Sequence, residues 1–134
     1  LAGLRVGYAM ALPEIIQGLD RVRLPFSVNI CGQKAAMASL DDQDHLQTSL
    51  RMNEEGKTYL QGEVERVGLF GFPTRANFIL IDVKTDGQTI FESLLRRGVI
   101  VRPLKHPRLR SMIRVTIGTP EQNTIFLREL KALL

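Results

Sequence analysis

Three arginines stand beside aliphatic residues in stretches that the sequence predicts to be strands or strand ends. They are Arg5, Arg102 and Arg114. Burying a guanidinium group without a partner is strongly unfavourable, so each of these side chains should meet an anion. The planar guanidinium suits two-pronged recognition of a carboxylate or a phosphate. The residues themselves leave two partners open: a bound small anion, or an internal acid, for which Asp82 on a neighbouring predicted strand is the candidate.

The distribution of charge favours a small anionic ligand. The chain carries 18 Lys and Arg against 14 Asp and Glu, a net charge of +4. No acid occurs between Glu92 and Glu121, a stretch rich in basic side chains. This stretch has no aromatic residue for base stacking and no basic helix suited to a groove, which argues against nucleic acid. Its basic residues are Arg96, Arg97, Arg102, Lys105, Arg108, Arg110 and Arg114.

Other kinds of site have weaker support. The single cysteine, Cys31, cannot form an internal disulfide, which favours a reducing, cytoplasmic setting. Nothing basic adjoins Cys31, so we expect a buried, unreactive thiol. We expect His45 to be solvated, and His106 to have a surface role unless it reaches an anion. One cysteine and two distant histidines do not make a structural zinc site, so no metal is expected.

The size and composition fit one folded domain. The chain has 134 residues, of which 44% are hydrophobic and 24% charged, enough for one core. No apolar run approaches the ~18 residues of a membrane span, so we expect no membrane association. The chain begins at Leu1, without Met, in residues that look like part of a folded element. Its length therefore does not show that the function is complete within it.

The first half of the sequence predicts mainly helices. After a short strand over 4–10, Pro13 suits the first turn of a helix that ends before Pro25. Its apolar residues recur at helical spacing, which predicts one apolar face. A second helix over 30–40 follows, with Asn29 or Ser27 as its cap. Asp41 and Asp42 then mark a break before a long polar helix that runs to about Val67.

The second half predicts alternating strands and helices. Gly68 and 71–73 are expected to be a loop. The expected elements are a strand over 76–83, a helix opened by Thr85 or Asp86 and closed by Gly98, a strand over 99–101 ending at Arg102-Pro103, a strand over 112–117, and a helix with a capping box at 119–122. The fold class is therefore α/β: a helical front half and then a small β-α-β-β-α domain.

At the three arginines the chain resembles a known family. The matching segments occur in the family's order and span essentially the whole chain, so they are specific together although each is weak alone. They are similar to fold-type-I pyridoxal-phosphate aminotransferases, most of all to histidinol-phosphate aminotransferases. The segments are Leu1-Ala2-Gly3-Leu4-Arg5-Val6-Gly7-Tyr8, 25–29, 76–80, 98–103, and 113–119 with Glu121-Gln122.

The resemblance implies a role for each arginine. Arg5 matches the family arginine that binds the phosphate of the cofactor, pyridoxal 5'-phosphate. Arg114 matches the arginine that holds the carboxylate of the substrate, as needed for glutamate and 2-oxoglutarate. Arg102 matches an arginine that helps hold the distal anion, which is the phosphate of histidinol phosphate or the side-chain carboxylate of glutamate. Asn77 fits a position near the family's active site, although a backbone role at the strand start is an alternative.

The resemblance also implies that the catalytic lysine of the family is not among the residues of this chain. The family's Schiff-base lysine lies in a Ser-Lys pair just before the Leu-Ala-Gly-Leu-Arg segment, so we expect it upstream of Leu1. No catalytic residue is then expected in the chain, and the chain alone is expected to be inactive. The implied division is the C-terminal edge of the cofactor-binding large domain over 1–40 and the small C-terminal domain over 41–134.

The resemblance implies that the parent enzyme is a cytoplasmic homodimer of histidine biosynthesis with a small anionic amino-acid or phosphate substrate. Two alternatives stay open. One is a pyridoxal-phosphate enzyme like threonine-phosphate decarboxylase, which shares the same arginines. The other is a stand-alone, non-catalytic domain that binds small anions.

Overall fold

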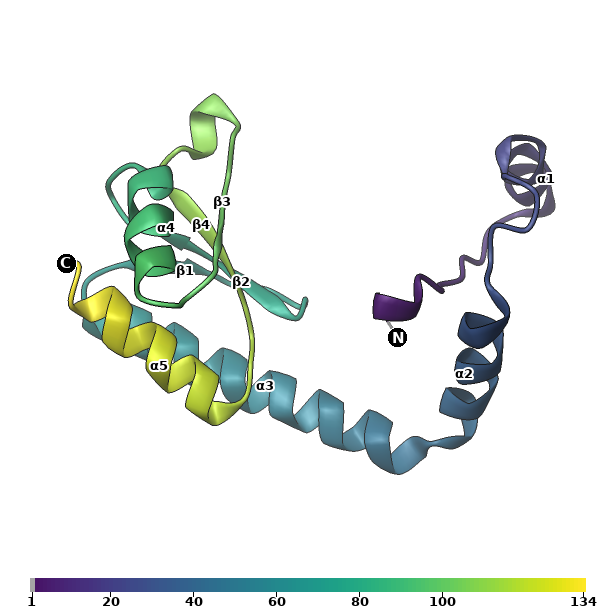
Figure 1. The fold of residues 1–134 in the computed structure, drawn as a ribbon, viewed down its shortest axis with the longest axis horizontal. Coiled ribbons are helices and arrows are strands. Elements are labelled where there is room, and N and C mark those ends of the chain that lie inside the picture. Colours follow the sequence, from purple (N-terminus) through teal and green to yellow (C-terminus); the bar gives the residue numbers. More distant parts are fainter. Residues whose placement is uncertain (1) are drawn as a thin grey trace. The chain divides into compact units, whose positions relative to one another are not determined.

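A computed structural model describes residues 2–134 of the chain (Figure 1). The chain divides into two compact units, Leu1–Gln47 and Thr48–Leu134. The long helix α3, Gln43–Arg66, begins in the first unit and continues in the second. None of the helices within residues 2–134 combines the length and the apolar character that crossing a membrane requires.

The first unit is helical, as the sequence predicts. A short 3-10 helix, Ala2–Leu4, precedes α1, Pro13–Val22, and α2, Ile30–Asp41. Pro13 occupies the first turn of α1, where its missing N–H costs nothing. Of the two predicted caps of α2, Asn29 is the one used, since its Oδ1 accepts the backbone N–H of Gly32 at 2.7 Å.

The expected strand over 4–10 is wrong. Leu4 ends the 3-10 helix, Arg5 forms a turn with a φ of 55°, and the residues that follow are in no regular element. A strand is stable only beside a hydrogen-bonding neighbour, and the described residues of the first unit include no second strand.

The first unit leaves its apolar side chains exposed. The predicted apolar face of α1 is present, yet Leu12 is 68% and Val22 77% exposed. The only buried residue among the described part of this unit is Gly32. The amphipathic pattern therefore predicted the helix correctly, but in this chain the apolar face packs into no core.

A four-stranded antiparallel sheet forms the centre of the second unit. Its strands, in spatial order, are β1 (Phe70–Phe72), β2 (Phe78–Asp82), β4 (Met112–Thr116) and β3 (Arg102–Pro103). The predicted strands β2, Phe78–Asp82, and β4, Met112–Thr116, are confirmed. The predicted strand over 99–101 is displaced, because β3 is Arg102–Pro103. Val99 does not join the sheet, because its N–H donates at 2.9 Å to the carbonyl of Leu94, near the end of the preceding helix.

The edge strand β1, Phe70–Phe72, falls where the sequence predicts a loop. It has three residues and Gly71 at its centre, so it carries little of the usual strand signal. Gly71 also lets the Ile79 side chain pack closely, because a Cβ at this position would lie 2.8 Å from Ile79 Cδ1, which would have to shift. The α/β class is thus confirmed, with one more strand than expected in the small domain.

Helices complete the second unit (Figure 1). The helix α4, Gly87–Arg96, starts at the Asp86 cap and packs against β3 and β4, while α5, Pro120–Lys131, starts with the predicted capping box. One continuous core joins α3, the sheet, α4 and α5. Its fully buried members are Leu60, Val64, Ile79, Ile81, Leu94, Ile113 and Leu130.

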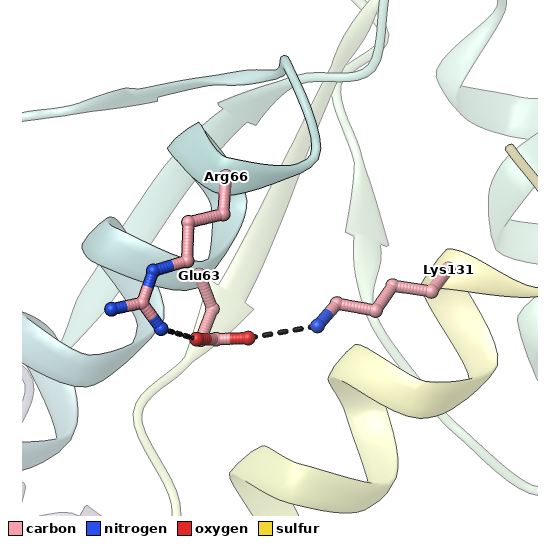
Figure 2. A network of polar contacts seen from close by, with 3 residues as sticks. All are labelled: Glu63, Arg66 and Lys131. Atoms are coloured by element: carbon pink, nitrogen blue, oxygen red, sulfur yellow. Dashed lines mark hydrogen bonds and ion pairs between the residues drawn. The ribbon is translucent and has the colours of Figure 1, made fainter.

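Helices α3 and α5 are also joined by charge (Figure 2). The Glu63 carboxylate accepts from Lys131 Nζ at 2.8 Å, and its other oxygen pairs with Arg66 one turn along α3. The hydrogen bonds from Lys131 and Arg66 lower the pKa of Glu63 below its usual value of 4.5. The ionised carboxylate of Glu63 thus links α3 to α5 through its ion pair with Lys131.

We expect Gly87→Ala to destabilise the chain and Gly62→Ala to stabilise it. A Cβ on Gly87 would lie 2.8 Å from the Met112 carbonyl oxygen and 2.9 Å from that of Arg110, whereas a Cβ on Gly62 meets nothing within 4 Å. Urea unfolding should show a loss of about 1–3 kcal/mol for the first variant and a gain of ~0.5–1 kcal/mol for the second. A gain for both would contradict the close packing of α4 on the 110–112 backbone.

We expect Glu63→Gln to lower stability at neutral pH but not in acid. Because the folded-state pKa of Glu63 is lowered, its contribution is present above 4.5 and is lost as the pH falls through the folded value. Urea unfolding at several pH values should show that the free energies of unfolding of the wild type and Glu63→Gln become equal below the folded-state pKa of Glu63. Glu65→Gln, an exposed neighbour on α3, is the control and should give no such convergence.

Candidate functional site

Two of the three predicted arginines are brought together in the second unit. Arg102 on β3 is the direct cross-strand partner of Arg114 on β4. Both line a pocket of about 850 Å³ beside α4. The remaining lining residues are Gln88, Phe91, Ile100, Val101, Pro103, Leu104, Lys105 and Thr116. Among the described residues 2–134, the side chains that line this pocket therefore include cations and no acid.

Arg114 is half-buried, as its strand setting predicts. The alternation of β4 turns Ile113 and Val115 into the core and places Arg114 on the other face of the sheet. Its guanidinium carbon lies 5.0 Å from the centre of the Phe78 ring, a cation–π arrangement. The aromatic face supports the charge without neutralising it, so the hydrogen-bond donors of the guanidinium stay available for an anion.

Asp82 is not the partner of Arg114 in the sheet. The register places Leu80 opposite Arg114 and Asp82 opposite Met112. An oxygen of Asp82 instead accepts the backbone N–H of Lys84 at 2.9 Å. The internal ion pair, one of the two alternatives from the sequence, therefore does not form at this position.

Arg102 is exposed, contrary to the expectation of a buried charge. Its strand has two residues and lies at the edge of the sheet, so the side chain reaches the pocket from the rim. Lys105, which the sequence places only in the general basic stretch, also lines the pocket. Sequence spacing could not identify it, because it follows the strand in an irregular loop.

Arg5 lies in the first unit and is likewise exposed. Its backbone N–H and its Nη1 both donate to the Ala2 carbonyl, each at 3.2 Å. Asn29 holds this turn to the start of α2, since its Nδ2 donates to the Leu4 carbonyl at 2.8 Å while its Oδ1 caps the helix. The sequence predicted the cap but missed the second bond, which fixes the backbone next to Arg5.

The other candidate residues lie outside the arginine pocket. Asn77 lines a separate hollow with Arg75, and its backbone carbonyl accepts the N–H of Ile117 at 2.9 Å. His106 is exposed and its Nδ1 accepts the backbone N–H of Arg108. Cys31 is exposed, so the expectation of a buried thiol is wrong: α2 buries only Gly32.

The opposed arginines should reduce the stability of the ligand-free chain. Like charges directly opposite each other on neighbouring strands repel, so Arg102→Gln should raise the free energy of unfolding by about 0.2–1 kcal/mol. Urea unfolding should show the gain at ~0.01 M salt and a smaller gain at ~1 M, where charges are screened. The exposed Arg75 has no such cross-strand partner, so Arg75→Gln serves as the control. Destabilisation by Arg102→Gln would contradict the repulsion.

The chain is similar over its whole length to curated aminotransferases. It is 49% identical over 134 residues to histidinol-phosphate aminotransferase of Moorella thermoacetica, covering 100% of this chain and 35% of that protein. It is 44% identical to the enzyme of the same name from Symbiobacterium thermophilum, covering 100% of this chain and 37% of that protein. The chain thus spans about a third of the length of these relatives.

Solved structures agree with this relationship. Histidinol-phosphate aminotransferase from Sinorhizobium meliloti, determined in complex with pyridoxal-5'-phosphate, superposes with a TM-score of 0.85 at 25% identity, covering 100% of this chain and 39% of that one. L-threonine-O-3-phosphate decarboxylase from Porphyromonas gingivalis shares the fold with a TM-score of 0.80 at 22% identity. The superposition covers 98% of this chain and 42% of that one. The family model of class I and II aminotransferases matches residues 1–130. The chain therefore belongs to the class I and II aminotransferase family.

Proposed function

We propose that the protein carrying this chain is a pyridoxal-phosphate-dependent histidinol-phosphate aminotransferase of histidine biosynthesis, with glutamate and 2-oxoglutarate as the amino donor and acceptor pair. The observation that carries this proposal is the cross-strand pair Arg102 and Arg114 in one pocket without an acid. The relatives at up to 49% identity support the same reading. A substrate with an anionic group fits a pocket of this charge.

Arg114 is proposed to hold the substrate carboxylate. A half-buried guanidinium above an aromatic ring is shielded from water on one side, which strengthens its attraction for an anion. Arg102, at the open rim, is proposed to hold the distal phosphate or side-chain carboxylate. Binding the substrate at anionic groups fixes its orientation relative to the reacting atoms, which is a proximity contribution to the rate.

The residues near Arg5 fit the phosphate of pyridoxal 5'-phosphate. The guanidinium bonds one carbonyl through Nη1, which leaves donors of its five N–H groups for a phosphate. Asn29 fixes the adjoining backbone, so the side chain extends from a held turn. The cofactor, when bound, supplies an electron sink for the chemistry at the substrate. The contribution of this chain is to bind and orient anions.

The domain division and assembly are also proposals. Residues 1–40 would be the C-terminal edge of the cofactor-binding large domain and 41–134 the small C-terminal domain. The exposed apolar residues of the first unit support its being part of a larger domain, since Tyr8 is 87% and Phe26 102% exposed and apolar surfaces are usually covered by further protein. We also infer a homodimer from the family resemblance, and a cytoplasmic location from the single cysteine, which favours a reducing compartment.

We expect Arg114→Gln in the full-length enzyme to reduce kcat/KM for glutamate by about ten- to a hundredfold, the range for one hydrogen-bonded charge. Arg114→Lys should restore only part of the loss, because a lysine cannot form the two-pronged contact. Steady-state kinetics with glutamate and with histidinol phosphate measure both effects. Arg108→Gln, in the same basic stretch but outside the pocket lining, is the control.

The same kinetics can reject the proposal. A wild-type protein that transfers no amino group from glutamate or from histidinol phosphate would exclude a histidinol-phosphate aminotransferase. Release of carbon dioxide from threonine phosphate in that assay would favour the decarboxylase alternative. Anion binding without any turnover would favour the non-catalytic domain.

A further inference from the structure

The pocket contains more positive charge than its two arginines provide. Lys105 lines it together with Arg102 and Arg114, and no acidic side chain of the part of the chain that the structure describes does so. Of the acids closest to this wall in sequence, Asp86 pairs with Arg110 at 3.6 Å, and Glu92 accepts at 2.9 Å from Nε2 of Gln88, which is itself a lining residue. The third cation therefore adds to the charge of the pocket without an acid on its wall to offset it.

The loop that carries Lys105 is held against the sheet. Leu104, directly before it, donates its backbone N–H to the Met112 carbonyl at 3.3 Å. On the other side, the His106 side chain accepts the Arg108 N–H, and Pro107 begins a short 3-10 turn. With Pro103 in β3, these features restrict the backbone on both sides of Lys105. The backbone of Lys105 is thus restrained beside the pocket, close in sequence to the β3 arginine, while its exposed side chain keeps its own freedom.

The number of negative charges on an anionic group determines whether a further cation strengthens its binding. A carboxylate carries one negative charge, which a single guanidinium can balance, whereas a phosphate monoester carries about −1.5 to −2 at neutral pH and presents three acceptor oxygens. Lysine binds phosphate as a flexible point charge, while arginine provides the planar fork. The combination of Arg102 and Lys105 at one rim therefore matches a phosphate better than a carboxylate.

We propose that Lys105 determines specificity in this pocket by supplying the additional charge that favours a phosphate group over a carboxylate at the distal position. This inference rests on the proposed function for the identity of the substrate, and on the pocket geometry for the phosphate preference itself. In an enzyme that must accept both histidinol phosphate and glutamate, Lys105 would then act mainly on the phosphate substrate.

The test compares anion binding by the full-length protein and by three variants. Inorganic phosphate and acetate are titrated separately and followed by phosphorus and carbon NMR line broadening. Lys105→Gln should weaken phosphate binding about fivefold, as expected for one partly screened ion pair, and leave acetate binding unchanged. Lys105→Arg should restore phosphate binding. Arg108→Gln removes a charge from the same loop outside the pocket lining and should change neither ligand.

Several results would overturn the inference: no phosphate binding by the wild type, equal weakening by Lys105→Gln and Arg108→Gln, or equal weakening of phosphate and acetate. Turnover of histidinol phosphate by the same preparations separates this inference from the proposed function. Lys105-dependent phosphate binding without turnover would reject the aminotransferase and keep the phosphate preference. Turnover without an effect of Lys105→Gln on phosphate binding or on KM for histidinol phosphate would reject the role of Lys105 alone.

Discussion

The antiparallel pairing of β4 with its two neighbours is the interaction on which the candidate site depends. Its alternation sends Ile113 and Val115 into the core, where Ile113 is fully buried, and leaves Arg114 on the opposite face. The same strand pairs with β3 so that Arg102 stands directly across from Arg114. A shift of one residue in this register would bury the guanidinium and expose the aliphatic side chains. The core therefore holds the cationic pocket in place.

The pocket brings like charges together, which should lower the stability of the sheet. Two guanidinium groups on neighbouring strands repel each other, and Lys105 adds a third charge at the rim. The Phe78 ring beneath Arg114 offsets part of that repulsion without taking the place of an anion. Stability comes from elsewhere in the unit, from the shared core and from the charge pair between α3 and α5. A ligand with negative charge would remove the repulsion, which couples binding to the stability of the sheet.

The sequence predicts the helices well because their signals are local. Asn29, Asp86 and Thr119 each cap the helix that follows, because the side chain accepts the backbone N–H of the residue three positions later. It predicts strands less well, because a strand depends on a neighbour. The expected strand over 4–10 has no partner in its unit, and the Phe-Gly-Phe strand exists only because β2 lies beside it. Burial follows the same rule, since α1 has an apolar face that packs into no core.

By itself, the sequence determined the residue chemistry of the site: arginines among aliphatic neighbours, an acid-free basic stretch, and a family resemblance that the relatives confirm. Only the tertiary structure decided which charges meet. The opposition of Arg102 and Arg114, the exclusion of Asp82 and the presence of Lys105 all follow from strand register and from a held loop. Register is a property of two segments together, fixed by hydrogen bonds and core packing between residues far apart in the chain, so no single stretch of sequence contains it.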